Sequence, residues 1–177
     1  MQMILVSRCL LGHRVRYDGG AHGPYDVLAR WQAEGRVIAL CPEVAGGLPT
    51  PRPAAEIPGG QGAQVLDGLL PVVSIEGEDF TAQFVSGAEQ ALALVKKHDI
   101  AIALLKARSP SCGNIENYDG SFSGNKVAGE GVTAALLRRA GVAVFNEEQL
   151  DACLLYTSDA ADDSLRVDLG GRRIIKK

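Results

Sequence analysis

Three of the four cysteines occupy similar places along this sequence. Cys9, Cys41 and Cys112 each come after a short apolar run that predicts a buried strand, Cys112 in the loop that follows its run. In open parallel α/β sheets, ligands bind outside the carboxyl ends of the strands. We therefore expect the three thiols at one edge of a sheet, where they could form a three-thiolate pocket.

A pocket of thiolates suits soft metals and iron–sulfur clusters. A disulfide is not expected in a cytosolic chain, and the paired Cys-x-x-Cys or His spacings of structural zinc sites are absent. A single cysteine is most often a small buried residue, but three at one edge favour a ligand set. A cubane cluster on three thiolates would leave one iron open as a Lewis acid. The spacing alone does not decide the metal, and Cys153 lies apart from the three.

Acid–base groups accompany the cysteines. Glu43 stands two positions after Cys41, where a carboxyl group could move a proton or activate a water molecule. Ser109 and Ser111 stand just before the third cysteine and could hydrogen-bond a substrate or relay a proton. The simpler alternatives are an ion pair between Glu43 and Arg52, and serines that cap a turn.

The remaining titratable residues have simpler interpretations. Lys106 and Arg108 could offset the negative charge of thiolates and a cluster. His13 and His22 lie in a glycine-rich region without a paired ligand, which favours surface or supporting positions. His98 comes near the end of a predicted helix, where it favours the helix dipole.

Apolar periodicity predicts an alternation of strands and helices. Continuous apolar runs predict strands at residues 3–7, 37–40, 100–105 and 142–145. Helical spacing predicts helices at about 24–34, about 81–98 and 132–140, with Asp79 or Thr81 capping the second. This alternation predicts a single α/β domain, with a Rossmann-like, mostly parallel sheet and helices on both faces. Segment 42–62 is too rich in Pro and Gly for regular helix or central strand, and 109–131 reads as a polar loop.

Composition and charge narrow the possible partners. The formal net charge of -3, without a basic stripe, argues against strong binding to nucleic acid. The first apolar run is short and reaches Arg8 at once, unlike a signal peptide, and no apolar segment has the length of a membrane span. We expect a cytoplasmic protein with a small-molecule substrate; the oligomeric state is not predicted.

Taken together, the motifs resemble a bacterial family once listed as a domain of unknown function and now associated with 2-thiouracil desulfidases. The resemblance rests on Cys9-Leu10-Leu11-Gly12 with Val15-Arg16-Tyr17-Asp18-Gly19, on Cys41-Pro42-Glu43-Val44 with Gly46-Gly47-Leu48-Pro49-Thr50-Pro51-Arg52 and Ala55-Glu56-Ile57, and on Leu105-Lys106-Ala107-Arg108-Ser109-Pro110-Ser111-Cys112-Gly113 with Tyr118-Asp119-Gly120 and Gly129-Glu130-Gly131-Val132-Thr133. It covers roughly residues 3–148.

The resemblance implies a [4Fe-4S] cluster held by Cys9, Cys41 and Cys112. It also implies that Glu43 is the catalytic carboxylate and Ser109 the active-site serine, with Ser111 close enough to be the alternative. The implied reaction is non-redox hydrolysis of a thiolated nucleobase such as 2-thiouracil to uracil and hydrogen sulfide. Two alternatives stay open: desulfidation of thiolated tRNA or a nucleoside, and a non-enzymatic module that binds a metal or cluster.

The C-terminal segment differs from the rest of the chain. Residues 156–177 are polar, lack periodicity and resemble a translated sequencing adapter. We expect the desulfidase domain to span residues 1–155, followed by an artefactual or disordered tail at 156–177.

Overall fold

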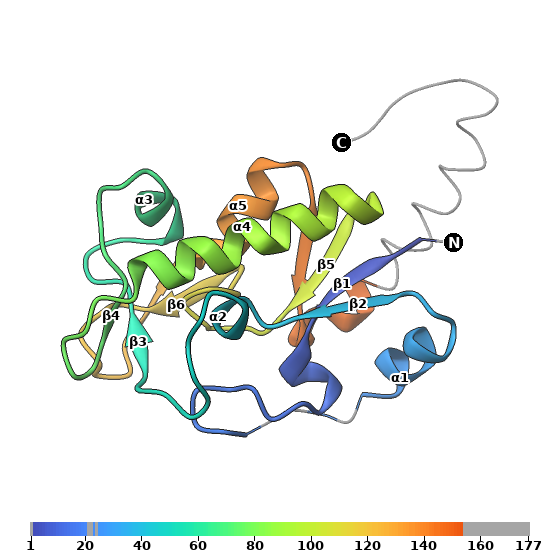
Figure 1. Cartoon of the computed structure of the whole chain (residues 1–177), viewed down its shortest axis with the longest axis horizontal. Coiled ribbons are helices and arrows are strands. Elements are labelled where there is room, and N and C mark those ends of the chain that lie inside the picture. The colour runs from blue at the N-terminus through green and yellow to red at the C-terminus, as the bar shows by residue number, and fades with distance from the viewer. Residues whose placement is uncertain (1, 21–22, 24, 154–177) are drawn as a thin grey trace.

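The four predicted strands pair side by side in one parallel sheet (Figure 1). The computed structural model describes residues 2–20, 23 and 25–153. The strands are β1 (Ile4–Ser7), β2 (Val37–Leu40), β5 (Ile102–Leu105) and β8 (Ala143–Asn146). They lie in the order β2-β1-β5-β8, and every neighbouring pair is parallel. The predicted α/β class is confirmed, and this order is the flavodoxin-like variant of the doubly wound fold.

Helices cover both faces of this sheet. In Figure 1, α4 (Thr81–His98) and α5 (Val132–Arg139) lie on one face and α1 (Asp26–Ala33) lies on the other. Neither predicted residue is the N-cap of α4, which is Phe80 and makes no side-chain capping bond. Asp79 lies one position earlier, and its Oδ1 accepts the backbone N–H of Thr81 at 2.8 Å. Hydrogen bonds from the side chain and the backbone of Thr81 lower the pKa of the Asp79 carboxyl group. Thr81 does not cap the helix, since its Oγ1 accepts the N–H of Val72.

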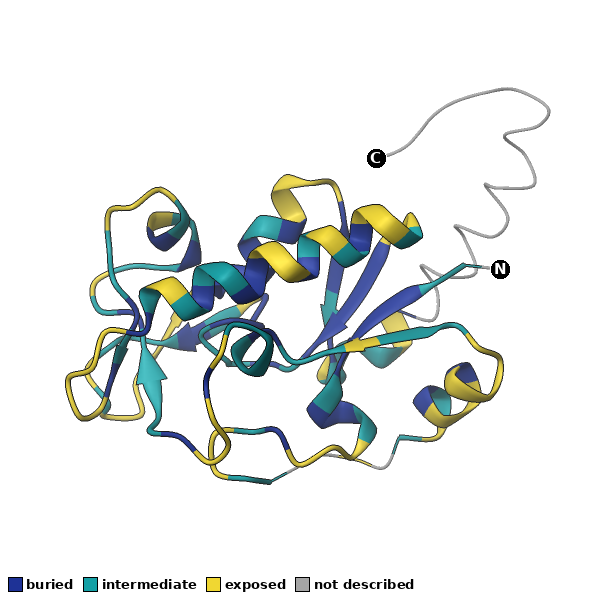
Figure 2. Ribbon diagram, viewed as in Figure 1, coloured by how far each residue is buried: buried dark blue, intermediate teal, exposed yellow. Residues whose placement is uncertain are grey.

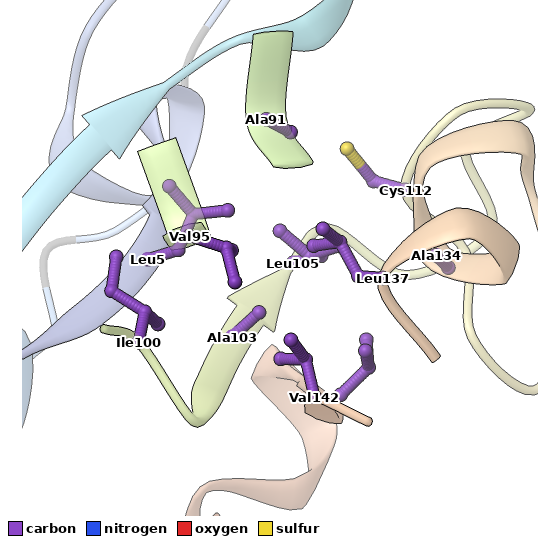
Figure 3. Packing of buried hydrophobic residues seen from close by; sticks show 11 residues of the cluster. Leu5, Ala91, Val95, Ile100, Ala103, Leu105, Cys112, Ala134, Leu137 and Val142 are labelled. Atoms are coloured by element: carbon purple, nitrogen blue, oxygen red, sulfur yellow. The ribbon is translucent and has the colours of Figure 1, made fainter. Parts of the chain in front are cut away.

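Alternate residues of the central strands enter two separate cores, as the two-residue period of a strand requires. Leu5, Ala103 and Leu105 face α4 and α5, within the cluster drawn in Figure 3. Ile4 and Val6 enter the opposite core, which packs against α1. Figure 2 shows the central strands as an almost continuous buried layer. Because both faces of these strands are buried, their sequences are continuous apolar runs and do not alternate with polar residues.

The expectation that segment 42–62 contains no regular helix was wrong at its start. Residues Pro42–Ala45 form the single turn α2. Pro42 is tolerated there because the first helical position needs no N–H partner. Helix α2 packs closely on α4, and a Cβ on Gly87 of α4 would lie only 1.9 Å from the carbonyl oxygen of Pro42. The glycine therefore determines how near α2 lies to α4.

The polar loop expected at 109–131 contains a β-hairpin. Its strands are β6 (Glu116–Tyr118) and β7 (Lys126–Ala128), which pair antiparallel. Further short elements are η1 (Arg8–Leu11), β3 (Ala55–Glu56), α3 (Gly62–Leu66), β4 (Val73–Ser74) and η2 (Glu147–Gln149). Strands β3 and β4 form a second small antiparallel pair. These elements lie beyond the carboxyl ends of the large sheet's strands (Figure 1).

Some sequence-based predictions fall outside the described residues. The tail predicted at 156–177 does so, as do His22 and the expected helix start at Pro24. Among the helices that the structure describes, none is long and apolar enough to cross a membrane.

Candidate functional site

Three strand ends meet at one cavity of about 460 Å³. Cys9 follows β1 in the turn η1, Cys41 links β2 to α2, and Cys112 lies in the turn after β5. The cavity lies where β1 and β5 are neighbours and the strand order reverses, which is the usual ligand site of this fold. All six predicted site residues line it: Cys9, Cys41, Glu43, Ser109, Ser111 and Cys112.

The three thiols are free, close together and shielded from water. Cys9 is 8% exposed and Cys112 is 4% exposed, whereas Cys41 is partly buried. Burial, followed by the nearby Cys41, raises the pKa of the Cys9 thiol to about 11. Burial likewise raises the pKa of Cys112 to about 12 and the pKa of Cys41 in the same direction. Without a cation these thiols keep their protons, and a coordinated metal would remove them.

This donor set fits an iron–sulfur cluster. Cysteine thiolates are the usual protein ligands of such clusters, and the cavity lining supplies three cysteines. The hydroxyl groups of Ser7 and Ser111 lie 3.6 and 3.4 Å from Cys112 Sγ and can donate to it. Hydrogen bonds of this kind stabilise a thiolate.

Glu43 is held by a buried arginine. Arg52 Nε donates to Glu43 Oε1 at 3.0 Å, and the Arg52 side chain is only 2% exposed. The terminal nitrogens of the same guanidinium group also donate. Nη1 donates to the carbonyl oxygen of Pro49 at 3.0 Å and to Thr50 Oγ1 at 3.1 Å, and Nη2 donates to the carbonyl oxygen of Val15 at 3.0 Å. The ion pair offered as the simpler alternative for Glu43 is therefore present. It leaves Oε2 directed at the serines, so the carboxylate has a fixed orientation in the cavity.

Both serines contact the same carboxylate oxygen. Glu43 Oε2 accepts from Ser109 Oγ at 3.3 Å and from Ser111 Oγ at 3.2 Å. Ser109 Oγ also accepts the backbone N–H groups of Ser111 and Cys112, both at 3.2 Å, so it caps the turn as well. Ser111 is 1% exposed, whereas Ser109 is partly exposed. Ser109 is thus the more accessible hydroxyl group, and Ser111 links Glu43 to Cys112.

The two cations predicted to offset negative charge line the cavity and are themselves paired. Lys106 Nζ lies 3.0 Å from Glu147 Oε2 and donates to the carbonyl oxygen of Ala107. Its charge is among the influences that lower the pKa of Cys9. Arg108 pairs with Glu148, which raises the pKa of the guanidinium group, and with Glu116 at 3.3 Å.

Other candidates lie outside the cavity lining. His13 is exposed and its Nδ1 is 3.2 Å from Arg8 Nε, as expected of a surface residue. His98 forms part of the basic last turn of α4. Cys153 is buried in the core on the α1 side.

Sequence reasoning missed the outer half of the cavity. Its lining there includes Glu56 and Ile75 beside β3 and β4, and Tyr118 and Phe122 on the hairpin. The local signals were Ala55-Glu56-Ile57, which the family resemblance includes, and Tyr118-Asp119-Gly120, which indicates a turn. A turn motif does not show that the hairpin folds back over a cavity formed by strands far away in the sequence.

Fold and site together define a class of protein: a doubly wound α/β domain whose ligand crevice holds three thiols, a carboxylate and two hydroxyl groups. A family model described as 2-thiouracil desulfurase matches residues 4–149, and the chain belongs to this family.

Two similar proteins support the assignment. The chain is 44% identical to YbbK of Bacillus subtilis (strain 168) over 152 residues, which cover 86% of this chain and all of YbbK. A solved structure described as the [4Fe-4S]-dependent thiouracil desulfidase TudS is 50% identical, with a TM-score of 0.82. The match covers 89% of this chain and 99% of TudS.

Proposed function

We propose that this protein removes sulfur from a small thiolated nucleobase such as 2-thiouracil, giving uracil and hydrogen sulfide. The observation that carries the proposal is the convergence of three thiols, Glu43 and two serines on one cavity. Family membership and the activity of the 50% identical TudS support it. Cys9, Cys41 and Cys112 would hold a [4Fe-4S] cluster, which when bound supplies an iron atom without a protein ligand, a sulfur-binding Lewis acid.

The side chains divide the proton transfers of hydrolysis among them. Replacing C=S by C=O consumes one water and releases H₂S, so both protons of the attacking water must be transferred to the departing sulfur. Glu43 is placed for this transfer, because Arg52 holds Oε1 while Oε2 faces the cavity side with the serines. Ser109, the more accessible hydroxyl, orients the substrate or the water. Ser111 Oγ lies within hydrogen-bonding distance of both Glu43 Oε2 and Cys112 Sγ, so it helps to hold the carboxylate and the thiol in place.

The cavity favours a small substrate over a polymer. Its volume of about 460 Å³ lies within the range of small-molecule sites. The net charge of -3 gives no electrostatic attraction for tRNA, so a free base or nucleoside is the better candidate. The free cysteines of the described chain suit a reducing compartment, which we propose is the cytoplasm.

The direct test is Glu43→Gln in protein reconstituted with iron and sulfide without oxygen. We expect this variant to keep wild-type iron and sulfide contents but to lose 2-thiouracil turnover by about 100-fold or more, because the amide cannot accept the proton. Glu89→Gln on the exposed side of α4 is the matched control and should keep full activity. Full turnover by Glu43→Gln would remove the assigned role, and a metal-binding module without enzymatic activity would show no turnover in any variant.

A further inference from the structure

The cavity has two ends of different chemistry. The three thiols, Glu43 and the serines lie at the carboxyl ends of the sheet strands. The opposite side is formed by the β6–β7 hairpin and the β3–β4 pair, and its lining includes the apolar or aromatic side chains of Ile75, Tyr118 and Phe122 as well as Glu56. Ile75 is 61% exposed, although an apolar side chain at a cavity rim is more stable when covered. This side is suited to an apolar, flat ligand surface.

Glu56 anchors the hairpin loop at the cavity. Its Oε1 accepts the backbone N–H of Gly120 at 2.9 Å and that of Phe122 at 3.1 Å. The loop also packs tightly against the chain after β3, since a Cβ on Gly120 would lie 2.4 Å from Pro58 Cα. A backbone bond from Asp119 N–H to the Asn125 carbonyl oxygen, 2.9 Å long, closes the loop. Phe122 is therefore held in place by its backbone.

Phe122 adopts a backbone conformation that its side chain disfavours. Its φ is 57°, in the left-handed region that bulky residues rarely occupy. Strain of this kind persists where surrounding contacts impose it, and it is concentrated at functional sites. Core packing of the ring does not offset this strain, because Phe122 belongs to none of the three hydrophobic core clusters of the described residues. The two cation–π contacts among the described residues involve the rings of Tyr17 and Trp31, not that of Phe122.

We propose that the Phe122 ring stacks on the planar ring of the thiolated base, and that Glu56 is a positioning residue that holds the loop carrying it. This inference rests on the proposed function for the identity of the ligand. An aromatic face binds the flat π-surface of a base, whereas the sulfur-bearing edge is left free to reach the thiol end of the cavity. Phe122 would thus select for unsaturated, planar rings.

Binding of two ligands without a C–S bond tests this independently of turnover. Uracil is planar, whereas 5,6-dihydrouracil has nearly the same polar edge on a puckered ring. We would measure the dissociation constants of both by calorimetry on the reconstituted holoprotein. Wild type should prefer uracil, and Phe122→Leu should weaken uracil binding by about tenfold while changing dihydrouracil binding by less than about twofold. Phe122→Tyr should restore the preference.

Glu56 variants separate positioning from chemistry. Glu56→Ala should lose the same selectivity, and Glu56→Gln, which keeps an acceptor oxygen, should recover part of it. Glu56→Ala combined with Phe122→Leu should add little to either change, because both act through one ring. Val127→Ala, on the exposed face of the same hairpin, is the control and should bind both ligands as wild type does.

The proposal would be overturned by no measurable uracil binding by wild type, by an unchanged ligand preference in Phe122→Leu, or by equal weakening of both ligands in that variant. A preference lost in Tyr118→Leu but kept in Phe122→Leu would assign the stacking to the other aromatic residue and would also overturn it. Turnover of 2-thiouracil by wild type decides the proposed function separately, so the two failures are distinguishable.

Discussion

At the scale of single residues, Arg52 determines what the site can do. Its guanidinium group connects the loop after η1, through Val15, with the proline-rich segment that follows α2, and it fixes one oxygen of Glu43. Because this arginine is buried, its charge is tolerated only while these acceptors surround it. The orientation of the proposed proton-transfer group thus depends on Arg52, which binds the turn α2 that directly follows Cys41.

Arg52→Met removes this buried partner and leaves Glu43 unpaired in a largely buried position. We expect the free energy of unfolding to fall by roughly 3 kcal/mol, as is typical when one member of a buried ion pair is lost. Arg138→Met is the comparison, because it breaks an ion pair with Glu130 in which the arginine is half exposed. This variant should lower the free energy of unfolding by less than about 1 kcal/mol. Urea denaturation of both variants makes the comparison. Equal losses would show that the Glu43 pair contributes no more than a surface contact.

At the scale of elements, predictability followed the strength of the local signal. The strands were predicted because burial on both faces gives continuous apolar runs such as Ile102–Leu105. Helix α4 was predicted because its apolar positions recur over many turns. The turn α2 and the hairpin β6–β7 were missed, since a few residues carry too little propensity and tertiary contacts decide their form. The thiol end of the site was accordingly predicted and the aromatic end was not.

Gly87 shows how one element positions another. An alanine in the middle of a helix normally stabilises it by roughly 0.5–1 kcal/mol relative to glycine. Here the new Cβ would meet the Pro42 carbonyl oxygen at 1.9 Å, and this backbone atom cannot rotate away. We expect the clash to dominate, so that Gly87→Ala is destabilising by about 1–3 kcal/mol. Because α2 carries Glu43, 2-thiouracil turnover should fall as well.

The control for Gly87→Ala is Glu89→Ala, a substitution to the same residue on the exposed side of α4. It should leave both thermal stability and turnover nearly unchanged. Were Gly87→Ala to raise the melting temperature, helix propensity would outweigh the contact and α2 would have room to move away from α4.

At the scale of the whole molecule, the three thiols connect parts of the chain that no local interaction joins. Cys9, Cys41 and Cys112 follow three different strands and meet only when the sheet β2-β1-β5 is assembled. A cluster bound by all three therefore has its ligand set in the native state alone. Binding to the native state stabilises it by mass action, so cluster occupancy and folding must be coupled.

This coupling predicts that the cluster-loaded protein melts at a higher temperature than the same protein stripped with a chelator, both measured without oxygen. Cys112→Ser should lose most of this difference, because the hard hydroxyl group replaces a thiolate ligand. Cys153→Ser is the matched control, since this cysteine is also buried but lies in the core on the α1 side. Its baseline stability should fall because a polar group enters an apolar core, while the difference between loaded and stripped protein should remain. An equal difference in Cys112→Ser would mean that the bound metal is held by something other than the three converging thiols.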